Sequence, residues 1–147
     1  MMQCLRLLFL AGLIALSFVA PGQSAALAPE KIGCADFLTL LHIKPIHVQF
    51  VECKLDNNRQ GKPLRAIYSV PGVHAAAAEA FLVRAANLSY LKKSCCQWDS
   101  PPSQFTGEDG QAYTIYMVSP ETSVDHREQW RDVPSFEIVV ETLTEDI

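Results

Sequence analysis

Cysteines are the residues whose type and spacing point most directly to chemistry in this sequence. Of the five, Cys4 lies near the start, and Cys34, Cys53, Cys95 and Cys96 follow. Cys4 lies in a segment that we expect to be removed on export, which leaves four cysteines, and an even number in an exported chain predicts two disulfides, for which three connectivities exist. A zinc site is the alternative, but zinc ligands usually pair at short loop spacings, and only Cys95 and Cys96 are near each other. We therefore expect disulfides, with no metal ion and no other cofactor.

Cys95 and Cys96 are neighbours, which restricts how they pair. Successive side chains on a strand point to opposite faces, and consecutive Cα atoms lie about 3.8 Å apart, below the roughly 4.4 to 6.8 Å usual for a disulfide. A bond between these two cysteines would be strained. We therefore expect Cys34 and Cys53 each to bond a different one of them, which fastens both faces of one strand. The alternative is a strained, easily reduced Cys95–Cys96 bond that acts as a redox switch.

A catalytic histidine is the second chemical possibility. His126 is flanked by Asp125 and, two residues on, by Glu128, so a small hydrolase that uses His126 with Glu128 or Asp125 is one hypothesis. A solvated, charged turn explains the same residues. The sequence contains no G-x-S-x-G nucleophile motif, no H-E-x-x-H motif and no glycine-rich phosphate loop. These absences favour a protein without catalytic activity.

Two tryptophans are candidate binding anchors. Trp98 follows the cysteine pair, and Trp130 closes a segment between two expected strands. Tryptophan is enriched among the residues that dominate binding at protein interfaces. Packing in the core is the alternative for both side chains.

The first 26 residues have the three-part pattern of a secretory signal peptide. A short head with Arg6 precedes an apolar run of about 13 residues, which is shorter than the roughly 20 needed to span a membrane. Small residues at positions 24–26 predict cleavage after Ala26 or Ala25. We therefore expect residues 1–26 to be removed and residues 27–147 to form one small domain. The expected location is the periplasm or the medium, without a stable membrane anchor.

The charge balance restricts the partners. The chain has 12 Lys and Arg against 16 Asp and Glu, a formal net charge of −4. An acidic protein is poorly suited to nucleic acid or to an anionic membrane surface. We expect neither as a partner.

The secondary structure expected from periodicity is a series of paired strands interrupted by helices. Apolar spacing predicts helices over 34–42 and 73–87, and alternation or β-branched content predicts strands over 46–55, 64–70, 88–98, 113–118 and 136–143. A short helix or irregular turn is expected over 120–130, and 99–110 is the longest expected loop. This order predicts an α+β domain. Its antiparallel sheet has about five strands, with two to three helices mainly on one face and two disulfides.

Several short motifs together resemble a known group of proteins. They are CADFL at 34–38, FVEC at 50–53, a helix after VPG at 70–72, CCxW at 95–98, and MVSPET at 117–122 before a Trp. In these motifs the chain resembles a family of small exported bacterial proteins of unknown function. The resemblance implies export and a cysteine framework, and it implies no activity.

The function expected from these observations is that of an exported binding protein without catalytic activity. An inhibitor or immunity protein that acts on a cell-envelope enzyme or toxin is one such protein, with that protein as its partner. The hydrolase with His126 and a small-ligand carrier are the alternatives.

Overall fold

The computed structural model describes residues 32–145, so the predicted signal peptide at 1–26 lies outside the described residues. In chain order the elements are α1 (Phe37–Leu40), β1 (Gln49–Leu55), β2 (Leu64–Pro71), α2 (Gly72–Ala86), β3 (Lys92–Ser94), β4 (Gln97–Asp99), β5 (Ser103–Thr106), β6 (Ala112–Val118), the 3-10 helix η1 (Arg127–Asp132) and β7 (Ser135–Thr142). None of the helices in this part of the chain is long and apolar enough to cross a membrane.

The strands form one antiparallel sheet in the order β1-β2-β7-β6-β4-β3, with β5 also paired to β6. The predicted α+β class is therefore confirmed, but the described residues contain seven strands instead of about five. Two segments account for the difference. Residues 88–98, expected as one strand, fold into the β3–β4 hairpin, and the expected loop 99–110 contains β5, which pairs with β6 from Ser103 to Thr106.

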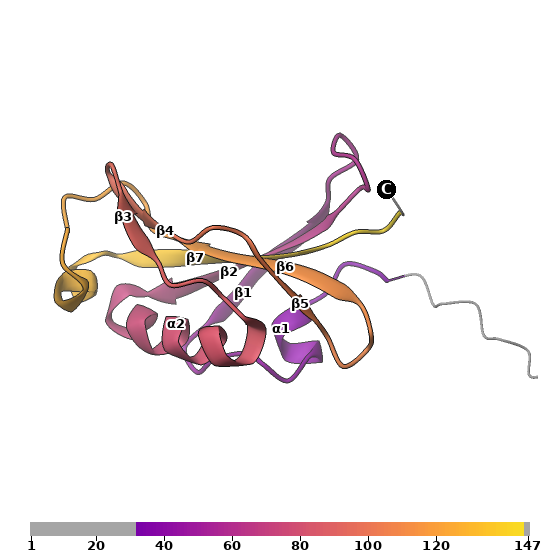
Figure 1. Ribbon diagram of the computed structural model, residues 1–147, viewed down its shortest axis with the longest axis horizontal. Coiled ribbons are helices and arrows are strands. Elements are labelled where there is room, and N and C mark those ends of the chain that lie inside the picture. Colours follow the sequence, from indigo (N-terminus) through magenta and orange to yellow (C-terminus); the bar gives the residue numbers. More distant parts are fainter. Residues whose placement is uncertain (1–31, 146–147) are drawn as a thin grey trace, which may run out of the picture. The chain divides into compact units, whose positions relative to one another are not determined.

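Both α-helices lie on the same side of the sheet (Figure 1). The side chains of β2, β6 and β7 that point to this side are buried and form the core with the inner faces of the helices. The alanines of α2 leave room for the helix to lie close to the sheet. The largest contributors to the core are Phe37, Leu38, Tyr68, Leu82, Ile115, Met117, Phe136 and Ile138.

Helix α1 is a single turn held by its first residues. Asp36 caps it by accepting hydrogen bonds from the backbone N–H and the hydroxyl of Thr39, and it also binds Lys44 Nζ at 2.7 Å. Burial raises the pKa of Asp36, but the hydrogen bonds from Lys44 and Thr39 outweigh it and the net pKa is lowered. The backbone N–H of Leu38 donates to the hydroxyl of buried Tyr68 in β2, which fixes the turn to the sheet.

Few residue types are tolerated at the two ends of helix α2. A Cβ on Gly72, its first residue, would lie 2.0 Å from the carbonyl oxygen of Val133 and 2.1 Å from that of Trp130. The helix ends at Asn87, which has a left-handed backbone with φ of 53°. Asparagine tolerates this conformation better than most residues do. The bounds of α2 differ by one residue at each end from the predicted 73–87.

The predicted disulfide pairing is wrong. Cys34 and Cys53 bond to each other, with their Cα atoms 5.5 Å apart. Cys53 lies opposite Ala66, whose side chain is buried on the helix side of the sheet, and Cys34 approaches from the segment just before α1. The two sulfurs therefore meet on that side. Cys95 and Cys96 are both exposed and form no disulfide within residues 32–145, so the sheet is fastened by one disulfide in this part of the chain.

Candidate functional site

The side of the sheet away from the helices carries the candidate site, which we call the open face. Because side chains alternate along a strand, the residues between the buried ones of β2, β6 and β7 point to this side. The pairing register places Arg65, Glu141 and Thr114 in one row across the three strands, and Ile67, Val139 and Tyr116 in the next. Val139 points to the open face and lies outside the main core cluster, yet its side chain is fully buried.

Arginine, tyrosine and glutamate side chains form a connected cluster at the middle of the open face. Arg65 Nη2 donates to the hydroxyl of Tyr116 at 2.8 Å, and Arg65 Nε lies 3.3 Å from Glu141 Oε1. Arg59, from the loop between β1 and β2, donates to the same carboxylate oxygen at 2.8 Å. Glu137 adds a weaker ion pair to Arg65 at 3.7 Å. One carboxylate therefore holds two guanidinium groups in fixed positions.

The charges in this cluster reinforce one another. The hydrogen bond and the negative charge of Glu141 raise the pKa of Arg59. Burial lowers the pKa of Arg65, but Tyr116, Glu137 and Glu141 outweigh it and the net pKa is raised. Both guanidinium groups thus stay cationic. The Glu141 side chain is 10% exposed and that of Arg59 is 53% exposed, so the carboxylate lies beneath an accessible guanidinium.

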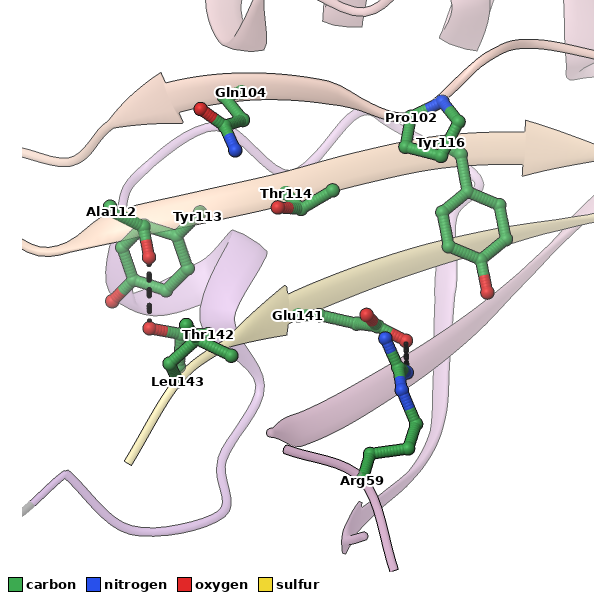
Figure 2. Close-up of a pocket in the computed structure, with 10 residues that line it drawn as sticks. All are labelled: Arg59, Pro102, Gln104, Ala112, Tyr113, Thr114, Tyr116, Glu141, Thr142 and Leu143. Carbon is green, nitrogen blue, oxygen red and sulfur yellow. Dashed lines mark hydrogen bonds and ion pairs between the residues drawn. The ribbon is translucent and has the colours of Figure 1, made fainter. Parts of the chain in front are cut away.

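A hollow of about 440 Å³ lies beside the cluster. Figure 2 shows Arg59 against Glu141 at one end of this hollow and Tyr116 above them. At the other end the hydroxyl of Thr142 donates a hydrogen bond to the carbonyl of Ala112. The remaining wall of the hollow comes from β5 and β6 and from the residues that flank β5 and β7: Pro102, Gln104, Tyr113, Thr114 and Leu143. A second hollow of about 330 Å³ lies at the other end of the open face, where Ile67, Val118, Pro120 and Glu137 are among its lining residues.

The predicted binding anchors lie in the interior. Trp98 is 6% exposed and Trp130 is 1% exposed. Their rings pack edge to face with centroids 5.2 Å apart, and Trp98 Nε1 donates to the carbonyl of Val124. This burial agrees with the alternative of core packing, and a role of either tryptophan as a binding anchor stays a prediction.

A partly buried ion pair positions these tryptophans. Arg127 makes two hydrogen bonds to the carboxylate of Glu79, whose side chain is 3% exposed, and a third to the carbonyl of Leu91. The backbone N–H of Leu91 donates to Glu79 in return. The guanidinium carbon lies 4.6 Å from the centre of the Trp130 ring, within cation–π range. This network joins α2 to η1 and to the start of the β3–β4 hairpin.

The candidate hydrolase residues lie on an exposed turn before η1. His126 Nε2 is 3.5 Å from Asp125 Oδ1. The side chain of His126 is 72% exposed and that of Asp125 is 67% exposed. Glu128 lies in the first turn of η1. No group of three or more His, Cys, Asp or Glu side chains in residues 32–145 is arranged to hold a metal ion.

Cys95 and Cys96 form the two-residue turn of the β3–β4 hairpin, because Ser94 pairs with Gln97. The expectation that they point to opposite faces of one strand is therefore also wrong. Cys95 has a left-handed backbone with φ of 50°. The sequence lacks the Asn-Gly or Gly-rich signal that usually marks such a turn, which explains why the hairpin was not predicted.

The open-face cluster was missed by reasoning from sequence. Arg65, Tyr116 and Glu141 come from three strands that are distant in sequence, and only the pairing register brings them together. One local signal was available. Charged residues that alternate with buried ones inside strands mark the solvent side of an antiparallel sheet, and Arg65, Glu137 and Glu141 follow that pattern.

The fold and the site define a class: a small α+β domain with helices on one face of an antiparallel sheet and, on the other, a hollowed surface with a charged cluster at its middle. Residues 22–98 match the family model of a domain of unknown function, DUF4952. Because the match covers more than half of the chain, the protein belongs to this family. No curated protein and no solved structure matches the chain. The match ends within β4, so β6 and β7, which complete the open face, follow the matched segment.

Proposed function

We propose that this chain is an exported binding protein that acts without catalysis and holds a partner protein against its open face. The observation that carries the proposal is the cluster of Arg65, Tyr116 and Glu141, fixed by hydrogen bonds between two hollows. Arginine and tyrosine are enriched in protein interfaces, and side chains that are already ordered lose little freedom on binding. An inhibitor or immunity protein for a cell-envelope enzyme or toxin is the form of this function that we favour.

The chemistry of the open face also indicates what the partner presents. The guanidinium of Arg59 is half exposed, and it already shares one carboxylate with Arg65. A carboxylate on the partner would complete its hydrogen bonding, since arginine can bind carboxylate groups with both terminal nitrogens. We therefore expect a partner loop that carries Asp or Glu to enter the larger hollow.

A small-ligand carrier fits the hollow less well. A volume of about 440 Å³ is in the range of ligand pockets. Half of the lining residues are apolar or aromatic, and the other half, Arg59, Gln104, Thr114, Glu141 and Thr142, are polar or charged. The charged Arg59–Glu141 pair at one end of the hollow favours a protein surface that presents a carboxylate over an apolar ligand.

Export is the location that supports this role best. The Cys34–Cys53 bond is of the kind that persists outside the reducing cytoplasm. The protein recovered from producing cells should therefore begin near Leu27, after removal of residues 1–26. N-terminal sequencing of that protein tests the location separately from the function.

A matched pair of charge variants tests the proposed function. Gln104 is exposed on β5 beside the larger hollow, and Ala85 is exposed on α2, on the opposite side of the sheet. Gln104→Glu should reduce partner retention from envelope extracts at least about tenfold, the equivalent of 1.4 kcal/mol, because its carboxylate repels that of the partner loop, whereas Ala85→Glu should leave retention unchanged. Equal retention of the partner by both variants would contradict binding at the open face.

A further inference from the structure

We propose that Cys95 and Cys96 form a reversible thiol–disulfide switch at the tip of the β3–β4 hairpin, which exchanges with disulfides of proteins or small thiols and sets the conformation of residues 119–124. Nothing in the chemistry of this site depends on the proposed binding function.

Accessibility is the first observation behind the proposal. Both thiols are exposed, and the β3–β4 hairpin extends from the edge of the sheet with its tip away from the helices (Figure 1). The other two cysteines of the described chain are bonded to each other. In the compartment where that bond forms, the nearest thiol to each of these two is therefore its neighbour.

The backbone of the turn is the second, independent observation. Cys95 has φ of 50°, a left-handed conformation that residues other than glycine and asparagine rarely adopt. Two-residue hairpin turns normally place glycine, asparagine or aspartate at such a position. Strained conformations of this kind are concentrated at functional sites. A cysteine here keeps a reactive side chain where the turn alone would favour glycine.

The exchange proceeds in two steps that balance in atoms and electrons. In the first, the Cys95 thiolate attacks a disulfide RS–SR, forms a mixed disulfide and releases RS⁻. In the second, Cys96, as thiolate, attacks the Cys95 sulfur of that bond, forms the Cys95–Cys96 bond and releases the second RS⁻. The protein loses two protons and two electrons, and the reagent disulfide is reduced to two thiols. The hydrogen bond with the Cys95 side chain raises the pKa of Cys96, so the first attack is assigned to Cys95.

The bond should be easy to reduce. Adjacent Cα atoms lie about 3.8 Å apart, which is below the usual range for disulfides, so ring closure needs movement of the turn. Strained, exposed disulfides are more oxidising than relaxed structural ones. The pair should therefore be reduced by a weaker reductant than the Cys34–Cys53 bond requires.

Movement of the turn would reach the neighbouring loop through hydrogen bonds. The carbonyl of Cys96 accepts from the backbone N–H of Thr122 at 2.7 Å. Lys93, three residues before Cys96 in β3, donates to the carbonyls of Thr122 and Val124 at 2.7 and 2.8 Å. Turning the Cys96 peptide would break the first of these bonds and release the loop. The start of this loop, at Ser119 and Pro120, also lines the smaller hollow of the open face.

Oxidised glutathione with peptide mapping under non-reducing conditions tests the chemistry. The full chain purified from producing cells should yield a peptide in which Cys95 and Cys96 have lost two hydrogens and resist alkylation. Dithiothreitol should reduce this bond at a concentration at least about tenfold lower than the Cys34–Cys53 bond requires. Cys96→Ser should accumulate the mixed disulfide of glutathione on Cys95, because the second step is blocked.

Hydrogen exchange then tests the coupling to the loop. The amide of Thr122 should exchange faster in the oxidised protein than in the reduced protein, and the Cys95→Ser/Cys96→Ser variant should show no difference. Three results would overturn the proposal: both thiols staying open to alkylation in excess oxidised glutathione, disulfide-linked dimers as the only product, or unchanged exchange at Thr122. None of these results bears on whether the open face binds a partner.

Discussion

Removal of the Arg127 guanidinium should destabilise the folded protein, because it leaves the buried Glu79 carboxylate without its charged partner. Arg127→Met keeps most of the side-chain volume but removes three hydrogen bonds and the cation–π contact with Trp130. Loss of one partner of a fully buried ion pair costs about 3 to 5 kcal/mol. Because the Arg127 side chain is 37% exposed, water partly compensates, and we expect a loss of about 2 to 3 kcal/mol. For a domain of this size that corresponds to a melting temperature lower by roughly 10 °C.

A second substitution in the same background tests the physical reason. Glu79→Gln removes the unpaired charge while its side-chain oxygen still accepts from the N–H of Leu91, so the double variant should regain about half of the lost stability. Arg84→Ala, at an exposed arginine of the same helix, is the control and should change stability by less than about 0.5 kcal/mol. Urea unfolding measures all of these variants. If Glu79→Gln adds its own cost to that of Arg127→Met, the buried charge is not what destabilises the single variant.

Three further predictions concern the glycine beneath α2, the disulfide and the cap of α1. Gly72→Ala should cost about 3 kcal/mol because the new methyl group meets two backbone carbonyls, whereas Gly33→Ala, with open space around it, should be neutral in the same urea unfolding experiment. Replacement of both Cys34 and Cys53 by serine should lower the melting temperature by the equivalent of about 3 kcal/mol, since the bond closes a loop of 19 residues in the unfolded chain. Asp36→Asn should cost up to about 1 kcal/mol at pH 7, and the difference should begin to shrink near pH 4 and be lost as the pH falls below the lowered pKa of Asp36. The sign follows from the lowered pKa of Asp36 in the folded state, which stabilises the protein above the pKa of the unfolded chain and no longer does so once the carboxylate is protonated.

The sequence predicted the fold class and the long elements, because α2 and the strands β1, β2, β6 and β7 have strong local signals. Helix propensity in the alanine-rich segment and alternation in the strands reflect the side of each element that is buried. The β3–β4 hairpin was missed because its turn contains Cys95 and Cys96 in place of common turn residues. That single error also produced the wrong disulfide pairing, since both cysteines were placed on one strand.

The candidate site could not be predicted to the same extent, because it depends on register. Arg65 and Glu141 are far apart in sequence, and their contact follows from the position of β7 between β2 and β6. The cysteine pair is different in kind. Its two residues are adjacent, so the sequence alone raised the redox alternative, and the structure adds the exposure and the backbone conformation that the proposal needs.

Site-specific photocrosslinking in producing cells is the most direct test of the central claim that the open face binds a partner protein. A photoreactive amino acid at Gln104 samples the open face, and the same amino acid at Ala85 samples the exposed side of α2. The account predicts a covalent product with one other protein from position 104 and none from position 85. A product from position 85 alone, or no product from position 104, would contradict it.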